Sequence, residues 1–291
     1  ASFQAISAVG AIPIPCDIET NSLTLNIEDA KNKITKKTKA IMPVHYAGHI
    51  GKYNEIYDLA KKNNLRVIED AAHAFGTKEG NKLVGSFGDI VCFSFDGIKN
   101  ITSGEGGCIV TCDEKVLKRV KDLRLLGVIN DSESRYAGKR SWEFDVNEQG
   151  WRYHMSDLMA AIGIEQLKKL DEFREIRQQL AMHYDMCLTK NPSFRILEKN
   201  YKNVLPHIYP IILSNKINRE ELQAYLLKNR IQTGIHYKPN HLLSYYSKNF
   251  KISLPNTDSI YKNILTLPLH ADLKKEDINY ICKKIKDFIE N

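Results

Sequence analysis

Three polar side chains follow apolar segments at spacings that could bring their chemistry together. Asp70 ends the run LRVIED, Ser94 lies near the end of DIVCFSF, and Lys99 follows five residues later. The next segment, NITSGEGG, holds three glycines, which permit sharp turns and let the backbone approach a ligand closely. A carboxylate, a hydroxyl and an amine at one place could hold a cofactor that carries a ring nitrogen, a phosphate and an aldehyde.

Pyridoxal 5'-phosphate (PLP) requires this set of groups. A lysine amine forms a Schiff base with the aldehyde, and desolvation lowers the pKa of such a lysine, so that it can act as a nucleophile and then carry a proton. A carboxylate keeps the pyridine nitrogen protonated, which makes the ring an electron sink. Hydroxyls and backbone N–H groups hold the phosphate. Lys99, Asp70 and Ser94 could fill these three roles.

Each of these residues also has an ordinary structural interpretation. Asp70 could cap a helix or close a turn, and Ser94 could be a core hydroxyl with a hydrogen-bond partner. The glycines could only shape a hairpin, and His73, in DAAHAF, could be an exposed residue at the start of a helix. The combination is more specific than any of its members.

For the three groups to meet, neighbouring strands of one sheet must carry them. Residues 37–46 and 65–72 are apolar, strand-like runs, and residues 51–64 between them place apolar side chains at i, i+3, i+4 and i+7, a helix period. This βαβ pattern predicts a parallel sheet, to which residues 88–95 and 106–112 add two more buried strands. Open α/β sheets bind ligands beyond the carboxyl ends of their strands, where Asp70 and Ser94 lie.

The rest of the chain predicts a long helix and a smaller unit. Polar residues 127–150 indicate a functional lid or a disordered loop. A long helix is expected from Ser156, with Ser156 as its cap and Asp157 in its first turn. The remaining strand and helix signals are NVLPHIYPIIL (strand), INREELQAYLLKNR (helix), QTGIHY (strand) and KKEDINYICKKIKDFIEN (helix). We predict a large PLP-binding α/β domain over residues 1–186, including the connecting helix, and a small α+β domain over residues 187–291.

Composition and charge narrow the class of protein. The 291 residues are 43% hydrophobic and 26% charged, which is typical of globular proteins. No run of about 18 apolar residues and no secretory leader is visible, so we expect a cytoplasmic protein without a membrane partner. The net charge of +7 comes from dispersed lysines, which argues against nucleic acid and suits a small anionic substrate.

The six cysteines are scattered and form no C-x-x-C pair. This spacing predicts thiols in a reducing compartment, and neither a metal site nor a disulfide. Cys108 and Cys112 flank an apolar segment that we expect to be a buried strand.

At this point the chain shows a family resemblance. The segment VIEDAAHAFGTKEGNKLVGSFGDIVCFSFDGIKNITSGEGGCIVTCDEK resembles the DegT/DnrJ/EryC1/StrS family of PLP-dependent sugar aminotransferases. Four further blocks match in the expected order: TKAIMPVHYAGH, GWRYHMSDLMAAIGIEQLKKLD, GIHYKPNHLLSYY and ILTLPLHADLKKEDINYI. The resemblance implies a fold-type I, aspartate aminotransferase-like architecture, with a mostly parallel sheet in the large domain and a smaller C-terminal α+β domain.

The resemblance also implies a role for each matching residue. Lys99 would be the Schiff-base lysine, Asp70 the partner of the pyridine nitrogen, His73 a contact of the ring oxygen and Ser94 a phosphate ligand. Family members that dehydrate sugars carry His in place of this lysine, so Lys99 implies transamination.

The chain departs from the family pattern at two places. In the block that the family writes G-Y-N-x-R-M, Arg152 stands at the position of the Asn that reaches the partner subunit's cofactor phosphate. Arg152 would either take over this contact, since a guanidinium can bind phosphate bidentately, or form only a surface ion pair. The first residues match a segment inside the family's large domain, so we expect the family's N-terminal segment, with its Gly-Thr phosphate turn and stacking aromatic residue, to be missing.

These observations predict a cytoplasmic, homodimeric aminotransferase that transfers an amino group from glutamate to a nucleotide-linked keto-sugar. His45 and His236 are candidates for lining the sugar site, or else are core histidines. One alternative is an inactive, truncated homologue that serves as a binding or dimerising subunit. Another keeps the enzyme but changes the amino acceptor to a cyclitol or a small keto acid.

Overall fold

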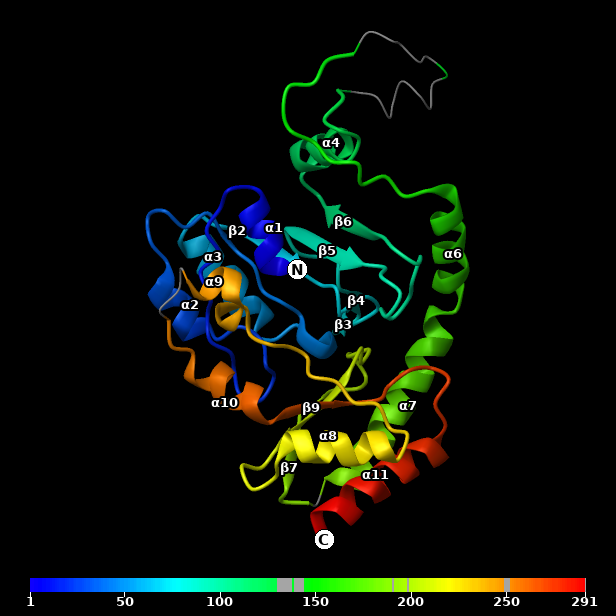
Figure 1. The fold of residues 1–291 in the computed structure, drawn as a ribbon. Coiled ribbons are helices and arrows are strands. Elements are labelled where there is room, and N and C mark those ends of the chain that lie inside the picture. The colour runs from blue at the N-terminus through cyan, green and yellow to red at the C-terminus, as the bar shows by residue number, and fades with distance from the viewer. Residues whose placement is uncertain (130–137, 139–143, 190, 198, 249–251, 291) are drawn as a thin grey trace.

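A four-stranded sheet forms the centre of the N-terminal part of the chain (Figure 1). The computed structural model describes residues 1–129, 138, 144–189, 191–197, 199–248 and 252–290. The strand order is β1–β2–β5–β6, and the strands are β1 (Ala40–Ile41), β2 (Arg66–Asp70), β5 (Ile90–Ser94) and β6 (Gly107–Thr111). The first three strands are parallel and β6 is antiparallel to β5, which matches the mostly parallel sheet expected from the sequence.

The βαβ unit predicted from the sequence is present. Helix α3 (Tyr53–Lys62) connects β1 to β2 and packs its buried face, with Ile56, Leu59 and Ala60, against Val67. Because the apolar residues of α3 recur at helical spacing, one side of the helix is free of charge and can cover the sheet. Helix α2 (Ile27–Lys33) packs beside α3, and its Asn26 cap accepts a hydrogen bond from the Asp29 N–H.

Alternation along the strands separates the two faces of this sheet. Val91 and Phe93 of β5 are buried in a core cluster on one face, whereas Ser94 points to the opposite face. In the register of β2 and β5, Asp70 pairs with Cys92, two residues before Ser94. Asp70 and Ser94 therefore project from the same face, at the carboxyl ends of adjacent strands.

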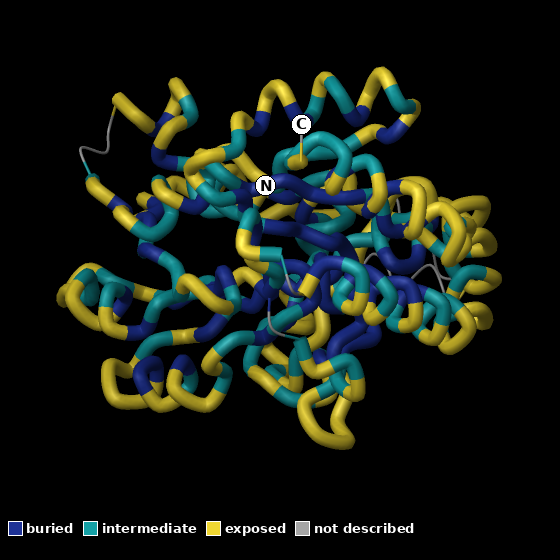
Figure 2. The backbone as a smooth tube through the Cα atoms, turned by 90° about the horizontal axis from the view of Figure 1, so that it is seen from below, coloured by how far each residue is buried: buried dark blue, intermediate teal, exposed yellow. Residues whose placement is uncertain are grey.

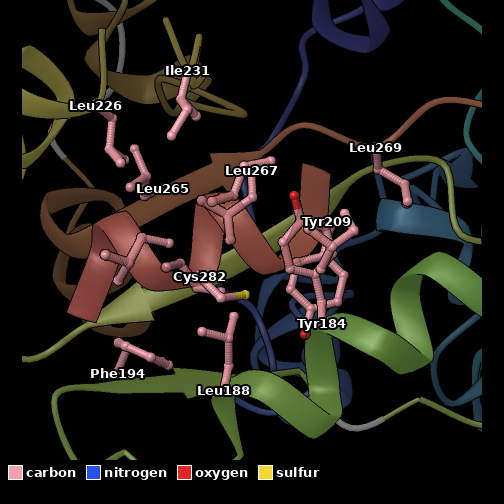
Figure 3. Packing of buried hydrophobic residues seen from close by; sticks show 14 of the residues in the cluster. Tyr184, Leu188, Phe194, Tyr209, Leu226, Ile231, Leu265, Leu267, Leu269 and Cys282 are labelled. Carbon is pink, nitrogen blue, oxygen red and sulfur yellow. The ribbon is translucent and has the colours of Figure 1, made fainter. Parts of the chain in front are cut away.

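The remaining strands form a two-stranded and a three-stranded sheet. Strands β3 (Lys78–Glu79) and β4 (Lys82–Leu83) form a hairpin, and the three-stranded sheet is antiparallel, in the order β7 (Phe194–Ile196), β8 (Tyr209–Leu213), β9 (Ile264–Leu267). Helices α7 (Leu170–Leu188), α8 (Arg219–Lys228) and α11 (Lys275–Glu290) pack around this second sheet. Figure 3 shows their shared core, in which the rings of Tyr184 and Tyr209 stack at 4.5 Å.

The structure describes seven further helices. They are α1 (Ser2–Ala8), η1 (Tyr46–Gly48), α4 (Glu114–Leu123), α6 (Asp157–Lys168), η2 (Asn240–Leu242), α9 (Ser244–Ser247) and α10 (Pro255–Asn263). Buried segments lie mainly at the centre of the molecule and exposed segments at its outside (Figure 2). No helix in the described ranges is long and apolar enough to cross a membrane.

Several sequence-based expectations are corrected by the structure. The long helix from Ser156 is two helices, α6 and α7, which meet at Lys169, although Ser156 caps α6 as predicted. QTGIHY forms no strand and contributes a single bridge, from Gly234 to Thr266. Strand β6 is not buried: it is an edge strand, and its Ile109 and Val110 are exposed. The polar segment 127–150 lies partly outside the described residues.

The predicted domain boundary at 186/187 falls inside helix α7. The C-terminal half of this helix, including Leu180 and Tyr184, belongs to the core of the second sheet. A further buried cluster joins residues from both parts of the chain, among them Tyr46 and Ile208. The division into two domains therefore stays a prediction.

Candidate functional site

The loop after β5 brings Lys99 back toward the sheet face that carries Asp70 and Ser94. The Lys99 N–H donates to the Asp96 carbonyl at 3.0 Å, and the Ser103 N–H donates to the Phe95 carbonyl at 2.9 Å, so the loop closes on itself. Gly104 has φ +82°, a conformation that other residues rarely adopt. A Cβ at Gly107 would lie 2.5 Å from the Phe93 carbonyl oxygen, so glycine is required where the loop enters β6.

The Lys99 ammonium forms no hydrogen bond or ion pair with any residue that the structure describes. Burial lowers its pKa from the ordinary value, and the negative charges of Asp96 and Asp70 partly oppose this shift. Because the charge of Asp70 affects the pKa of Lys99, the Asp70 carboxylate and the Lys99 amine lie close enough to interact. Lys99 is thus an available amine that loses its proton more readily than a lysine in water.

The Asp70 carboxylate is held by two donors. Its Oδ2 accepts a hydrogen bond from Ser2 Oγ at 2.5 Å, and its Oδ1 accepts one from the Ala72 N–H at 3.2 Å. Ser2 belongs to helix α1, 68 residues before Asp70. No sequence pattern singles out Ser2, because one serine near the start of a short helix has no distinctive spacing.

His73 is buried beside Lys99 and Asp70. Burial, and then the charge of Lys99, lowers the pKa of His73 to about 4, whereas Asp70 opposes the shift, so this imidazole is neutral at pH 7. Its Nδ1 accepts a hydrogen bond from the Ala47 N–H at 3.4 Å, which leaves the proton on Nε2. Nε2 lies 3.1 Å from the Tyr237 hydroxyl. The charges of Lys99 and Asp70 both shift the pKa of His73, so the three predicted residues lie close enough to interact.

The segment between α8 and η2 adds two residues from the C-terminal part of the chain. His236 Nδ1 lies 2.9 Å from Thr266 Oγ1, and burial followed by the charge of Lys99 lowers the His236 pKa. Burial and the charge of Asp70 raise the pKa of the neighbouring Tyr237. Sequence reasoning selected His236 but missed Tyr237, although Tyr237 follows it directly in GIHYKP.

Ser94 lies at the end of β5 and its hydroxyl oxygen accepts a hydrogen bond from the Asp96 N–H at 3.4 Å. The hydroxyl proton is therefore left to donate to another group. Its placement on the Asp70 face of the sheet follows from the strand register.

Two predicted site residues lie elsewhere. His45 is 1% exposed, and its Nε2 lies 2.7 Å from Oε2 of Glu69, which points to the opposite face of β2 from Asp70. His45 is thus a core histidine in this structure and is not available to a ligand. Arg152 is exposed on the segment between α4 and α6 (Figure 1), and its guanidinium has no hydrogen-bond or ion-pair partner among the described residues. The structure does not bring Arg152 to the other candidates within one chain.

The residues present fit the groups of PLP. An amine without a partner and with a lowered pKa suits the aldehyde, and an adjacent carboxylate suits the ring nitrogen. A strand-end hydroxyl with a free proton suits a phosphate oxygen. The fit rests on Lys99, Asp70 and Ser94, with His73 as a neutral neighbour.

Comparisons with known proteins agree with this chemistry. The family model described as the DegT/DnrJ/EryC1/StrS aminotransferase family matches residues 1–286. A UDP-4-amino-4,6-dideoxy-N-acetyl-beta-L-altrosamine transaminase of Campylobacter jejuni is 36% identical over 262 residues, which cover 89% of this chain and 68% of the transaminase. The spore coat polysaccharide biosynthesis protein SpsC of Bacillus subtilis is 31% identical, with 99% of this chain and 76% of SpsC covered.

A solved structure shows the same fold. Helicobacter pylori PseC, an aminotransferase involved in the biosynthesis of pseudoaminic acid, superposes with a TM-score of 0.89 at 29% identity. The match covers 98% of this chain and 75% of PseC. The predicted architecture, that of fold-type I PLP-dependent transferases, is confirmed.

Proposed function

The chain belongs to the DegT/DnrJ/EryC1/StrS aminotransferase family, and we propose that it transfers an amino group from glutamate to a nucleotide-linked keto-sugar, with PLP held on Lys99. The named activity of the C. jejuni relative and the polysaccharide pathway of SpsC support a nucleotide-linked substrate and a role in polysaccharide biosynthesis. The net charge of +7 suits such an anionic substrate. Six free thiols support a reducing, cytoplasmic location.

The observation that carries this proposal is the meeting of Lys99, Asp70 and His73. When bound, PLP supplies an electron-poor ring that can stabilise negative charge on a substrate carbon. Lys99 holds the cofactor, and its Nζ, with a lowered pKa, carries a proton to and from that carbon. Asp70 provides a negative charge for the ring nitrogen. The neutral His73 carries its proton on Nε2, which faces the Tyr237 hydroxyl here and would donate to the ring oxygen once the cofactor is bound.

Other residues would position the substrates. The Ser94 hydroxyl has a proton to donate to the phosphate. His236 and Tyr237 lie beside Lys99 and Asp70 and are proposed to line the sugar site. His45 is not included, because its side chain is buried and its Nε2 is paired with Glu69.

We also propose a homodimer with a shared site. None of the residues of helix α6 is buried in the described chain, and the helix exposes five apolar side chains: Leu158, Met159, Ile162, Ile164 and Leu167. Arg152, with its free guanidinium, lies just before this helix, and could reach a phosphate on the partner subunit.

The test is amine transfer by the purified, PLP-loaded protein. We expect glutamate-dependent amination of a member of a panel of nucleotide-linked keto-sugars. Lys99→Ala should abolish it, and Asp70→Asn should reduce it at least about 100-fold, since an uncharged amide no longer holds the ring nitrogen protonated. The exposed Lys31 provides the control, because Lys31→Ala removes an amine far from the site. A wild type that binds no PLP would support the inactive homologue instead, and transfer only to cyclitols or small keto acids would change the acceptor.

A further inference from the structure

A histidine from the C-terminal part of the chain contacts the residue directly after Lys99. Asn100 is buried, and its Nδ2 donates a hydrogen bond to the Phe75 carbonyl at 3.2 Å. A carbonyl can only accept, so this bond fixes the orientation of the amide and turns Oδ1 toward His207, whose Nδ1 lies 3.1 Å away. The His207 proton is therefore on Nδ1.

His207 is held in its neutral form. Its side chain is 4% exposed, and burial strongly lowers its pKa, with the positive charges of Lys99 and Arg177 adding to the shift. Arg177 Nη1 donates to the His207 carbonyl and to the Leu269 carbonyl, both at 3.1 Å. The backbone and the ring of His207 are thus both fixed. Its Nε2 is buried and has no hydrogen-bond partner in the described part of the chain.

The ring of His207 also touches the site directly. It packs on the ring of His73 with a centroid distance of 4.3 Å and an interplanar angle of 44°. One side chain, located just before β8, therefore contacts both the Lys99 loop and a residue proposed to touch the cofactor. The segment after Lys99 holds three glycines, whose backbone has more accessible conformations than that of other residues.

We propose that His207 is a positioning residue for Lys99: its Nδ1–H bond to Asn100 fixes the turn that aims the lysine amine at the cofactor aldehyde. In that reaction the nitrogen of the neutral amine forms a double bond to the aldehyde carbon, and the aldehyde oxygen leaves as water with the two amine protons. A loop that samples several conformations presents the amine correctly for a smaller fraction of the time, so the reaction slows without loss of the amine. This inference rests on the proposed function, because it requires PLP on Lys99.

The experiment mixes the cofactor-free protein with PLP and follows the visible absorbance that depends on Lys99. His207→Leu, which removes the donor, should slow the growth of absorbance at least about tenfold. His207→Asn places an amide N–H near the position of Nδ1 and should restore the rate to within about twofold of wild type. His183→Leu is the matched control, because it breaks another histidine–asparagine contact, to Asn279 on α11, and should leave the rate unchanged.

A His207→Leu protein that reacts at the wild-type rate would overturn the inference. If that variant does not fold by circular dichroism, Asn100→Ala removes the other side of the same bond and decides by the same assay. In the double variant the two effects should not add, since both remove one contact, and additive slowing would also overturn it. If the wild-type protein shows no absorbance that depends on Lys99, the proposed function itself is contradicted, and this inference is contradicted with it.

Discussion

Lys99 combines an unpaired amine with a partly buried environment. Most surface lysines remain charged because water solvates the ammonium, whereas burial around Lys99 disfavours the charged form. Asp70 and Asp96 oppose this effect without cancelling it. The result is an amine that is more nucleophilic at a given pH than an exposed lysine, which is what a carbonyl cofactor requires.

The lowered pKa predicts how the reaction with PLP depends on pH. The initial rate of absorbance growth should rise with pH as Lys99 loses its proton and should level off below pH 10.5, the ordinary pKa of a lysine side chain. Subtracting the signal of Lys99→Ala removes the contribution of other amines. A rate that still rises about tenfold per pH unit up to pH 10.5 would show that the amine is not perturbed.

Glu69 provides a second residue-scale prediction. Its carboxylate is fully buried and accepts hydrogen bonds from Tyr57 Oη at 2.6 Å and from His45 Nε2 at 2.7 Å. Glu69→Leu leaves the buried His45 and the partly buried Tyr57 hydroxyl without their acceptor and should lower the free energy of unfolding by about 3 kcal/mol. Urea denaturation at a fixed protein concentration measures this loss.

The surface pair of Glu28 and Lys31 serves as the control for Glu69. Both side chains are exposed, so Glu28→Ala should change stability by no more than about 0.5 kcal/mol. If Glu69→Leu is as mild as Glu28→Ala, the buried contacts of Glu69 do not stabilise the fold. The same reasoning predicts that changes at His45 lower stability rather than weaken binding of the sugar.

At the scale of the elements, strands β2 and β5 are joined by a side-chain bridge next to their parallel pairing. Asp89, directly before β5, accepts hydrogen bonds from Arg66 Nε at 2.7 Å and Nη2 at 2.6 Å, and from the Val67 N–H at 3.1 Å. The hydrogen bond from Arg66 lowers the pKa of Asp89, although partial burial opposes the shift. Folding therefore favours the charged form of the Asp89 carboxylate.

The Asp89 bridge predicts a pH-dependent loss of stability. A carboxyl whose pKa is lowered by folding contributes stability above its ordinary pKa of 3.8 and loses it as the pH falls through the folded value. Asp89→Asn should therefore destabilise the protein by about 1 kcal/mol at pH 7, and the gap from wild type should shrink below pH 3.8. Thermal melts at pH 7, 5 and 3 measure the gap, and an equal gap at pH 3 would refute the assignment.

The elements that could be predicted from sequence are those whose pattern is local. Helices α3 and α11 repeat apolar residues at helical spacing, and β2 and β5 are short apolar runs bounded by polar residues. The two strand predictions that were wrong concern segments whose structure depends on tertiary contacts. QTGIHY has strand-like composition but pairs with Thr266 only at Gly234. Strand β6 has an apolar centre like that of β5, yet Ile109 and Val110 are exposed, because the described chain does not cover them, and no local pattern encodes this.

At the scale of the whole molecule, the site draws on segments that are far apart in the chain. Ser2, Asp70, Lys99, His207 and Tyr237 converge from both ends of the sequence. The proximity of Asp70 and Lys99 was expected from the strand pattern together with the family resemblance. Ser2 and His207 could not be predicted, because each is a single polar residue whose importance comes from a partner about 70 to 110 positions away.

The exposed face of helix α6 predicts that two chains associate. Leu158 is 82% exposed and lies on a helix that buries none of its residues in the described chain. Sedimentation should give about twice the chain mass of 33.3 kDa for wild type, and Leu158→Asp should shift the protein toward the monomer. Leu227→Asp, at an exposed position of α8, should leave the dimer intact. A Leu158→Asp protein that remains dimeric would place the interface elsewhere.

The central claim is that Lys99 carries the cofactor beside Asp70. The most direct measurement is borohydride reduction of the PLP-treated protein, followed by proteolysis and mass spectrometry. We predict the mass of the reduced cofactor on the peptide that contains Lys99, and no such addition at that peptide in Lys99→Arg. Addition that falls mainly on other lysines, or that is unchanged in Lys99→Arg, would contradict the account.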